Sequence, residues 1–332
     1  MRTVVFVLVP GLHLLDLAGP AQVFSEVDNL GHPHRLVYLA EQDPVTRRPP
    51  PQASQRSSRS EAHGGDGRPG CMVPTAQGVA VRAETEWPVL GPEDLILVPG
   101  WRARSAQGRP LPGPAVLERL VEHHEAGGVV ASVCAGADAL GQAGLLDGRR
   151  CTTHHELQDN LARRYPRATV VPDVLYVADD RVVTSAGIAS GIDLALHLVA
   201  SRHGPTVAAR VARAMVVYAR RNGEEPQTSV ALRHRGHLHD VVHRVQDLID
   251  ARFAGPLPLA TLASAGGVSE RTLTRLFERA TGLTPLRYQQ LLRVERAEHL
   301  IGQGSTLEAA AHAVGFGDAR MLRRLRHRPG GS

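Results

Sequence analysis

Short runs of β-branched and other apolar residues recur along the first two thirds of the chain. Each run is apolar on both faces, which is typical of strands buried in a parallel sheet. The runs occupy residues 3–9, 35–40, 95–99, 129–133 and 182–185. Stretches with helical periodicity lie between them, at 19–30, 114–126, 135–145, 156–165 and 190–203. This alternation predicts an α/β fold with a parallel sheet.

The strand-like runs stop near residue 205, and the rest of the chain has a helical pattern. A polar stretch with Gly and Pro at 222–229 is the expected linker. We therefore expect an α/β domain at 1–205, a connecting helix and linker at 206–232, and an all-α domain at 233–332. The helices expected in the last part are 237–252, 258–265, 269–280, 285–301, 306–313 and 318–327.

Residues 44–70 interrupt the α/β pattern. The segment is rich in Pro, Ser, Arg and Gly and contains almost no apolar residues. Such a composition cannot bury a core, so we expect a disordered surface insertion.

Basic charge is concentrated at the carboxyl-terminal end of the chain. Residues 233–332 hold 15 arginines against nine acidic residues, whereas residues 1–232 carry a net charge of −1. The chain has no lysine, so its cations other than histidine are planar guanidinium groups, which suit phosphate and guanine. A basic end behind a near-neutral body predicts an anionic partner, most often nucleic acid.

The chain has three cysteines, Cys71, Cys134 and Cys151. This small, odd number argues against a disulfide scaffold and favours a reducing, cytoplasmic location. The opening apolar run is much shorter than the roughly 18 residues that span a membrane, and it has no cleavage-site pattern. We expect a strand there rather than a signal peptide, and no association with a membrane.

Two segments of the basic end resemble one another. Residues 259–277 and 307–326 each contain a short apolar helix, a Gly turn, a capping residue and a second helix. This order is the signature of a helix-turn-helix unit. Ser269 and Asp318 are the expected capping residues. The helix at 285–301 would set the two copies about one DNA turn, roughly 34 Å, apart.

In each copy, apolar side chains occupy one face of the second helix. Leu273 and Phe277 are expected in the core of the first copy. The opposite faces are expected to enter the major groove of double-stranded DNA, through Arg271, Thr272, Thr274, Arg275 and Arg279 in the first copy and Arg320, Arg323 and Arg324 in the second. A pair of helical hairpins with solvated arginines is the alternative, but the duplication and the excess positive charge favour DNA binding.

The stretch from about 237 to 327 resembles the DNA-binding domain of AraC-type regulators. The resemblance is carried by Gly267-Val268-Ser269-Glu270-Arg271-Thr272-Leu273, by Thr284-Pro285 with Tyr288, by Leu292-Arg293-Val294-Glu295-Arg296-Ala297 and by Val314-Gly315-Phe316-Gly317. It implies a transcription regulator that reads two adjacent major grooves.

The second copy departs from this pattern. Arg326 stands where the resemblance places a core aromatic, the counterpart of Phe277. No Thr-Pro and Tyr segment follows it, as Thr284-Pro285 and Tyr288 follow the first copy. We therefore expect the second helix-turn-helix unit to be truncated and to bind DNA weakly. A single protein chain would then bind DNA poorly, so we also expect a homodimer.

A cysteine stands directly after the run at 129–133. Cys134 is followed at once by an expected helix, and such a strand–nucleophile–helix turn exposes a nucleophile above a parallel sheet. The positive end of the helix would lower the pKa of the Cys134 thiol. Asp16, Gly100 and His154 also come after strand-like runs. Because the carboxyl ends of parallel strands share one edge, we expect Asp16, Cys134 and His154 to face one pocket.

Residues 1 to about 205 resemble the DJ-1/PfpI superfamily of class I glutamine amidotransferase-like domains. The resemblance is carried by Leu14-Leu15-Asp16-Leu17-Ala18-Gly19-Pro20, Val133-Cys134-Ala135-Gly136-Ala137, Thr152-Thr153-His154 and Ser185-Ala186-Gly187-Ile188. It implies a flavodoxin-like sheet, with Cys134 as the elbow cysteine, Asp16 as the acidic residue that contacts it and His154 as the nearby histidine. Gly100 and Ala135 complete the expected ligand pocket.

An α/β domain of this kind joined to an AraC-type end is similar to regulators of small nitrogen compounds, such as amino acids and quaternary amines. The resemblance implies a small-molecule effector at Cys134. Family members with hydratase activity carry Thr after the cysteine, where this chain has Ala135, so we expect sensing rather than turnover. The alternatives are a cysteine-dependent hydrolase or hydratase with a degenerate DNA-binding tail, and a redox sensor that acts through Cys134.

Four histidines cluster near the start of the helical domain: His234, His237, His239 and His243. No cysteine accompanies them, and their spacing matches no familiar zinc pattern. We expect neither a metal nor another cofactor.

Overall fold

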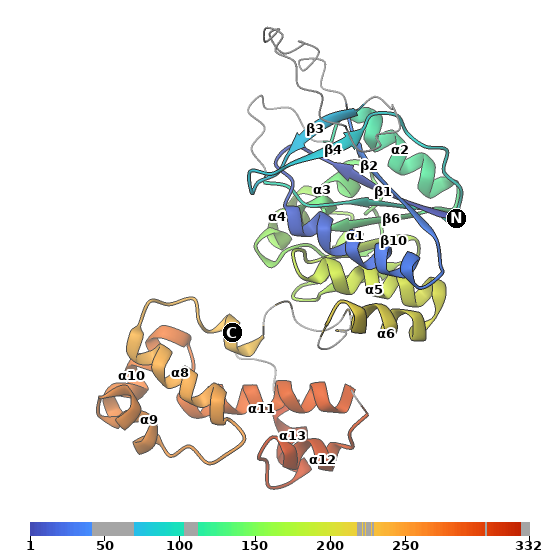
Figure 1. Cartoon of the computed structure of the whole chain (residues 1–332). Helices are drawn as coiled ribbons and strands as arrows, with labels where there is room; N and C mark the ends of the chain where they lie inside the picture. Colours follow the sequence, from blue (N-terminus) through green and yellow to red (C-terminus); the bar gives the residue numbers. More distant parts are fainter. Residues whose placement is uncertain are drawn as a thin grey trace, which may run out of the picture. The chain divides into compact units, whose positions relative to one another are not determined.

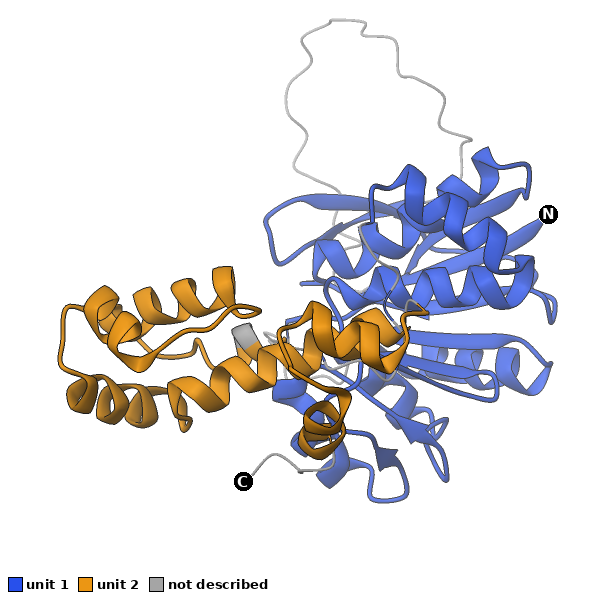
Figure 2. Ribbon diagram, turned by 90° about the horizontal axis from the view of Figure 1, so that it is seen from below, with its two compact units in different colours: residues 1–227 blue, residues 228–332 orange. Residues whose placement is uncertain are grey.

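The computed structural model of the chain describes residues 1–41, 70–102, 112–217, 221, 223, 227, 229–302 and 304–326 (Figure 1). The chain divides into two units, Met1–Gln227 and Thr228–Ser332 (Figure 2). The predicted insertion at 44–70 lies outside the described residues, except for Gly70, which begins a strand. Among the helices of the described residues, none has the length and apolar character needed to cross a membrane.

The first unit is built on an eight-stranded sheet in the order β3-β4-β2-β1-β5-β6-β10-β9 (Figure 1). Five strands of its centre pair in parallel and match the five apolar runs. They are β1 (Arg2–Leu8), β2 (His34–Ala40), β5 (Leu95–Val98), β6 (Val129–Val133) and β10 (Val182–Ser185). Most of their residues are buried, because helices cover both faces of the sheet. The predicted parallel α/β fold is confirmed.

The remaining strands are not predicted by the apolar runs. They are β3 (Gly70–Pro74), β4 (Ala80–Glu84), β7 (Arg150–Cys151), β8 (Thr169–Val170) and β9 (Tyr176–Asp179). β3 and β9 pair antiparallel at the two edges of the large sheet, and β7 pairs with β8 in a separate sheet. The edge strands bury few side chains (Val73 alone in β3), so their sequences carry little apolar signal.

Helices lie on both faces of the large sheet (Figure 1). One face carries α1 (Leu14–Asn29), α5 (Ser190–His203) and α6 (Pro205–Ala214), and the other carries α2 (Pro114–Glu125) and α3 (Ala137–Gln142). α4 (Gln158–Arg164) follows β7 along the chain. α5 has the predicted bounds, and Gly204, with a φ of 86°, ends it.

Predicted and observed helix bounds differ most for α1, for the helix after β6 and for α6. α1 begins at Leu14 rather than at residue 19, with Pro20 inside the helix. The helix predicted at 135–145 is a 3₁₀ turn, Cys134–Gly136, followed by α3. α6 ends at Ala214, and residues 218–220 of the predicted connecting helix lie outside the described residues.

Every regular element described in the second unit is a helix, as predicted. The six predicted helices correspond to α8 (Asp240–Arg252), α9 (Leu259–Gly266), α10 (Glu270–Thr281), α11 (Pro285–Gly302), α12 (Leu307–Ala313) and α13 (Ala319–Arg326). A further short helix that the sequence pattern does not predict, α7 (Val230–Arg233), precedes them.

The two helix-turn-helix copies have the turns and caps that their sequences predict. Gly267 and Gly315 take left-handed φ angles of 68° and 84° at the ends of the first helices. Ser269 Oγ accepts a hydrogen bond from Thr272 N at 3.3 Å, and Asp318 Oδ1 accepts one from Met321 N at 3.0 Å. These bonds satisfy N–H groups at the starts of α10 and α13.

Each copy has its own core, and Arg293 of α11 joins them. Its Nε donates to Phe253 O at 2.6 Å, one terminal nitrogen donates to Gly255 O at 2.8 Å, and the other donates to Gly315 O at 2.8 Å. The guanidinium also lies over the Phe316 ring, 5.6 Å from its centroid. We call this set of contacts the arginine clamp. It fastens the loop after α8 to the turn of the second copy.

The structure corrects the expectation that Arg326 occupies a core position. Its Nε donates to Glu298 Oε1 at 3.2 Å, and 40% of the side chain is exposed. Leu322 and Leu325 fill the core instead, since the helix turns them inward. The position that matches Phe277 by counting from the turn therefore lies at the surface.

We expect Arg326→Phe to change the free energy of unfolding by less than about 0.5 kcal/mol, as is usual for a surface substitution. Chemical denaturation measures this value. Leu322→Ala serves as the buried control and should cost about 2–5 kcal/mol. A clear stabilisation by Arg326→Phe would show that the position accepts a core aromatic after all.

Candidate functional site

Cys134 lies at a strained turn directly after β6. Its φ is 55°, a left-handed value that few residues other than glycine adopt. Glycines surround the turn: a Cβ on Gly100 would lie 2.7 Å from Cys134 Cβ, and a Cβ on Gly187 would lie 2.3 Å from it. A Cβ on Gly136 would lie 2.1 Å from Val98 O. The three glycines therefore allow the turn to pack tightly, and Cys134 is only 6% exposed.

Asp16 lies in the first turn of α1 and is fully buried against this turn. Its Oδ2 accepts a hydrogen bond from Gly100 N at 3.2 Å, and its Oδ1 accepts one from Ile188 N at 2.7 Å. Burial raises the pKa of the Asp16 carboxyl, and these two hydrogen bonds oppose the rise. The structure thus brings together three of the residues named for the expected pocket, Asp16, Gly100 and Cys134.

The expected low pKa of Cys134 is wrong. Burial and the neighbouring Asp16 charge raise the pKa of the thiol to about 12, and a hydrogen bond to the Asp16 carboxylate adds to the rise. The N–H of Ala135 favours the thiolate, but its effect is smaller. The thiol therefore stays protonated at neutral pH.

His154 is half-buried. Its ring stacks on His155 with 4.2 Å between centroids, and its Nδ1 accepts a hydrogen bond from Glu156 N at 3.4 Å. Burial and the neighbouring His155 lower its pKa. Within the part of the chain that the structure describes, no hydrogen bond or ring contact joins His154 to Asp16 or Cys134.

Residues that the sequence patterns do not single out contact the pair directly. Thr153 Oγ1 donates to Cys134 O at 2.8 Å, Ile188 N donates to Asp16, and Gly187 has a φ of 108° beside Cys134. Thr153 directly precedes His154, and Gly187 belongs to the stretch Ser185-Ala186-Gly187-Ile188. The spacing of these residues in the sequence gives no reason to prefer them to their neighbours.

We expect Asp16→Asn to increase the rate at which iodoacetamide alkylates Cys134 at pH 8. Only the thiolate reacts, and removing the adjacent negative charge lowers the thiol pKa. A fall of one pKa unit gives about a tenfold rise in rate. Mass spectrometry of the Cys134 peptide measures it, and the rate in the unmodified chain should still be rising above pH 9.

Cys151 provides an internal control for this measurement. It is fully buried, and its pKa is raised by burial and by Asp179 rather than by Asp16. Its alkylation should not respond to Asp16→Asn. Equal Cys134 rates with and without the substitution would contradict the electrostatic role of Asp16.

The second unit presents arginines on the outer face of α10. Arg271, Arg275 and Arg279 are exposed, whereas Leu273 and Phe277 on the opposite face are fully buried. The two threonines differ from the arginines. Thr272 Oγ1 accepts from Ser269 Oγ at 2.9 Å, and Thr274 Oγ1 donates to Glu270 O at 3.0 Å. Their hydroxyls are thus engaged within or next to the helix. Among the described residues, Arg271, Arg275 and Arg279 have no hydrogen-bond or ion-pair partner.

The corresponding face of α13 carries Arg320, Arg323 and Arg324, all exposed. Arg323 approaches Glu308 Oε1 at 3.7 Å. Leu322 and Leu325 are buried on the opposite face. Both copies therefore place basic side chains outward over an apolar core, which is the arrangement that major-groove recognition requires.

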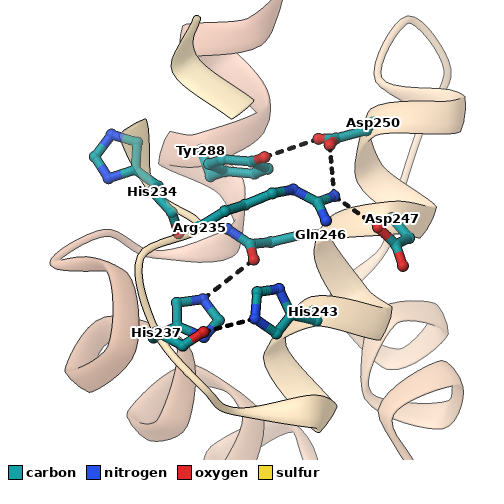
Figure 3. Close-up of polar contacts among 8 residues, drawn as sticks. All are labelled: His234, Arg235, His237, His243, Gln246, Asp247, Asp250 and Tyr288. Atoms are coloured by element: carbon teal, nitrogen blue, oxygen red, sulfur yellow. Dashed lines mark hydrogen bonds and ion pairs between the residues drawn. The ribbon is translucent and has the colours of Figure 1, made fainter. Parts of the chain in front are cut away.

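Within the histidine cluster, His237 and His243 use ring nitrogens on protein groups (Figure 3). His237 and His243 stack with 4.3 Å between centroids. His237 Nε2 contacts Gln246 Oε1 at 3.1 Å, and His243 Nε2 contacts His237 O at 2.7 Å. No group of three or more side chains suited to hold a metal occurs in the residues that the structure describes.

The sequence matches two protein families. Residues 2–201, more than half of the chain, match the DJ-1/PfpI family, and residues 262–328 match a helix-turn-helix domain family.

Two relatives match about half of the chain. The HTH-type transcriptional regulator GbdR of Pseudomonas aeruginosa is 33% identical over 187 residues, which are 56% of this chain and 50% of that protein. The chain thus spans about half the length of this relative. A protein of Streptomyces lividans, named an uncharacterized protein in the cpoL 5′ region, is 37% identical over 163 residues, or 49% of this chain and 94% of that protein.

A solved structure shares the fold. A THiJ/PfpI family protein from Pseudomonas syringae superposes with a TM-score of 0.50 at 18% identity, covering 80% of this chain and 89% of that one.

Proposed function

The chain belongs to the DJ-1/PfpI family and carries an AraC-type helix-turn-helix domain behind that part, and on this premise we propose that it is a sequence-specific transcription regulator. In this proposal residues 233–332 bind double-stranded DNA and residues 1–205 bind a small effector. The effector class is a small nitrogen-containing metabolite. The similarity to the HTH-type transcriptional regulator GbdR supports the assignment of the chain as a transcription regulator.

The observation that carries the proposal is the outer face of α10. A capped helix behind a Gly turn presents Arg271, Arg275 and Arg279 outward, over a core that holds Leu273 and Phe277. Guanidinium groups on one helix face can bond both phosphates and guanine edges. We assign direct contact with DNA to the arginines of α10 and α13.

Selection of bound fragments from random double-stranded DNA tests the proposal. The full chain should enrich related sequences, and its affinity for them should fall steeply with salt. A chain that binds the enriched and the starting DNA equally at moderate ionic strength is not a sequence-specific regulator.

The effector site is proposed at Asp16, Gly100, Cys134 and Ala135, with His154 at its margin. Three glycines and a buried carboxylate surround Cys134, which supports a site built for a small polar ligand. A raised thiol pKa fits binding better than nucleophilic attack, because the reactive thiolate is rare at neutral pH.

We also propose that the chain acts in the cytoplasm as a homodimer. Two copies would double the number of helix-turn-helix units on DNA, and we place the dimer surface on the α/β unit. Sedimentation of the full chain at micromolar concentration tests the oligomeric state, and a single monomeric species would oppose the dimer.

A cysteine-dependent hydrolase or hydratase is the second candidate function. The strained elbow at Cys134 beside Asp16 favours it, because strain of this kind is common at active sites. Consumption of a small amide or isocyanide by the full chain, abolished by Cys134→Ser, would support this candidate. A Cys134 redox sensor would instead change its DNA affinity on peroxide titration.

A further inference from the structure

The segment that joins the two units is anchored on the first unit. Arg221 Nε donates to Asp193 Oδ2 at 3.1 Å, and Asp193 is buried. Further along, the carbonyl oxygen of Gly223 accepts a hydrogen bond from Leu175 N at 2.8 Å. These contacts tie the segment to α5 and to the start of β9.

Gln227 is the last residue of the first unit. Its Nε2 donates to Thr153 O at 2.9 Å and to Val174 O at 3.0 Å. Its backbone N donates to Asp173 Oδ1 at 3.1 Å. Carbonyl oxygens only accept hydrogen bonds, so a side chain without an N–H or O–H donor, such as leucine, cannot replace this amide.

Thr153 connects Gln227 with the Cys134 site. The Thr153 side chain is 1% exposed, and its hydroxyl donates to Cys134 O while its carbonyl accepts from Gln227. Two hydrogen bonds through one buried residue therefore join the Cys134 backbone to the linker. Buried polar groups are costly to leave without partners, so a shift of the Cys134 turn is passed along these bonds more easily than it breaks them.

A contact with the second unit follows three residues later, at Val230. Val230 is 8% exposed, and its backbone N donates to Glu295 Oε1 at 3.0 Å. A terminal nitrogen of Arg235 then donates to Asp247 Oδ1 at 2.7 Å and to Asp250 Oδ2 at 2.8 Å (Figure 3). Only residues 228 and 229 separate the anchor at Gln227 from the anchor at Val230.

We propose that Gln227 couples the state of the Cys134 site to the DNA-binding unit, an inference that rests on the proposed function. A ligand beside Cys134 shifts the Thr153 backbone and so changes the hydrogen bond between Thr153 O and Gln227 Nε2. The two-residue tether then passes that change to the anchor at Val230. In this proposal Gln227 is a positioning residue that acts through Thr153. A chain of contacts becomes a coupling only when the coupling is measured.

Amide hydrogen exchange of the full chain measures it without DNA. Asp16→Asn perturbs the Cys134 site, and it should raise the exchange rate of residues 221–230 by about fivefold, the lower end of typical coupling between sites. In Gln227→Leu the exchange of this segment is already fast, and adding Asp16→Asn should change it no further. A segment that responds equally to Asp16→Asn with and without Gln227 overturns the proposal.

Gln158→Leu is the matched control. Gln158 Nε2 also donates to Thr153 O, at 3.3 Å, but it lies in α4 and not in the linker. This variant should keep the response to Asp16→Asn. If Gln158→Leu abolishes the response as fully as Gln227→Leu, the loop around Thr153 and not Gln227 carries the effect, and the proposal is wrong.

DNA binding provides the functional readout. Amino acids and the quaternary amine glycine betaine serve as probes, and a probe that changes affinity for a selected DNA fragment by about fivefold or more should lose that effect in Gln227→Leu. Affinity without the probe should stay within about twofold. A retained probe effect overturns the proposal. Absence of any preferred DNA refutes the proposed function instead, and the exchange result is then judged on its own.

An insertion into the linker tests the same proposal in case Gln227→Leu does not fold. Four residues, Gly-Ser-Gly-Ser, placed between residues 228 and 229 keep both anchors and lengthen the tether. The linker should still respond to Asp16→Asn in hydrogen exchange, while the probe effect on DNA affinity is lost. A full probe effect with the longer tether contradicts transmission through the linker.

Discussion

Replacing Arg271 and Arg275 together with alanine should weaken binding to a selected DNA fragment by at least about 30-fold. Each arginine contact with DNA typically contributes about 1–3 kcal/mol, and the two side chains lie one helical turn apart on the exposed face of α10. The buried face of the helix is untouched, so the fold should persist. Fluorescence anisotropy at several salt concentrations measures the affinity and its salt dependence.

The salt dependence separates two roles of these arginines. If both bond phosphates, the slope of log K against log salt should become shallower by about two. If they bond base edges, the slope should hardly change and discrimination between sequences should fall. Arg252→Ala, an exposed arginine in the last turn of α8, is the control and should leave affinity within about threefold. Equal losses in the control and the double variant would remove α10 from the interface.

Phe277→Ala should lower the free energy of unfolding of the second unit by about 3–5 kcal/mol. Phe277 is fully buried and packs edge-to-face on Tyr288, with 5.6 Å between ring centroids. Tyr288 in turn donates to Asp250, which also holds Arg235. The substitution therefore leaves a large cavity beneath the recognition helix, and DNA binding should be lost with it.

Denaturation followed by circular dichroism measures this effect. The first unit has a separate core, so its own transition should stay where it is in the unmodified chain. Leu286→Ala is the control, because Leu286 is 64% exposed and its removal should cost less than about 0.5 kcal/mol. A second unit that unfolds at the same denaturant concentration with and without Phe277 would disprove the role assigned to its core.

The strongest sequence signals correspond to the most buried elements. The run before Cys134 and the helix at 190–203 have the predicted bounds, since most of their residues are buried and burial selects apolar side chains. The strand β3 gives no such signal, because it buries Val73 alone. The start of α1 is missed for another reason: Gly19 and Pro20 suggest a break, yet the helix continues through them.

The candidate site could be predicted in position but not in chemistry. The strand ends bring Asp16, Gly100 and Cys134 together, as the topology of a parallel sheet requires. The pKa of Cys134 could not be predicted, because it depends on how deeply the chain buries the thiol beside a carboxylate. The contact between Thr153 and Cys134 depends on the course of a loop, which local sequence does not determine.

The arginine clamp has a consequence for the promoters that such a chain could control. Arg293 fastens the turn of the second copy to the loop after α8. The distance between α10 and α13 should therefore stay fixed when they bind DNA. One extra base pair between the two half-sites turns the second by about 35° around the duplex axis. Promoters recognised by this chain should therefore tolerate base substitutions in the spacer far better than insertions or deletions there.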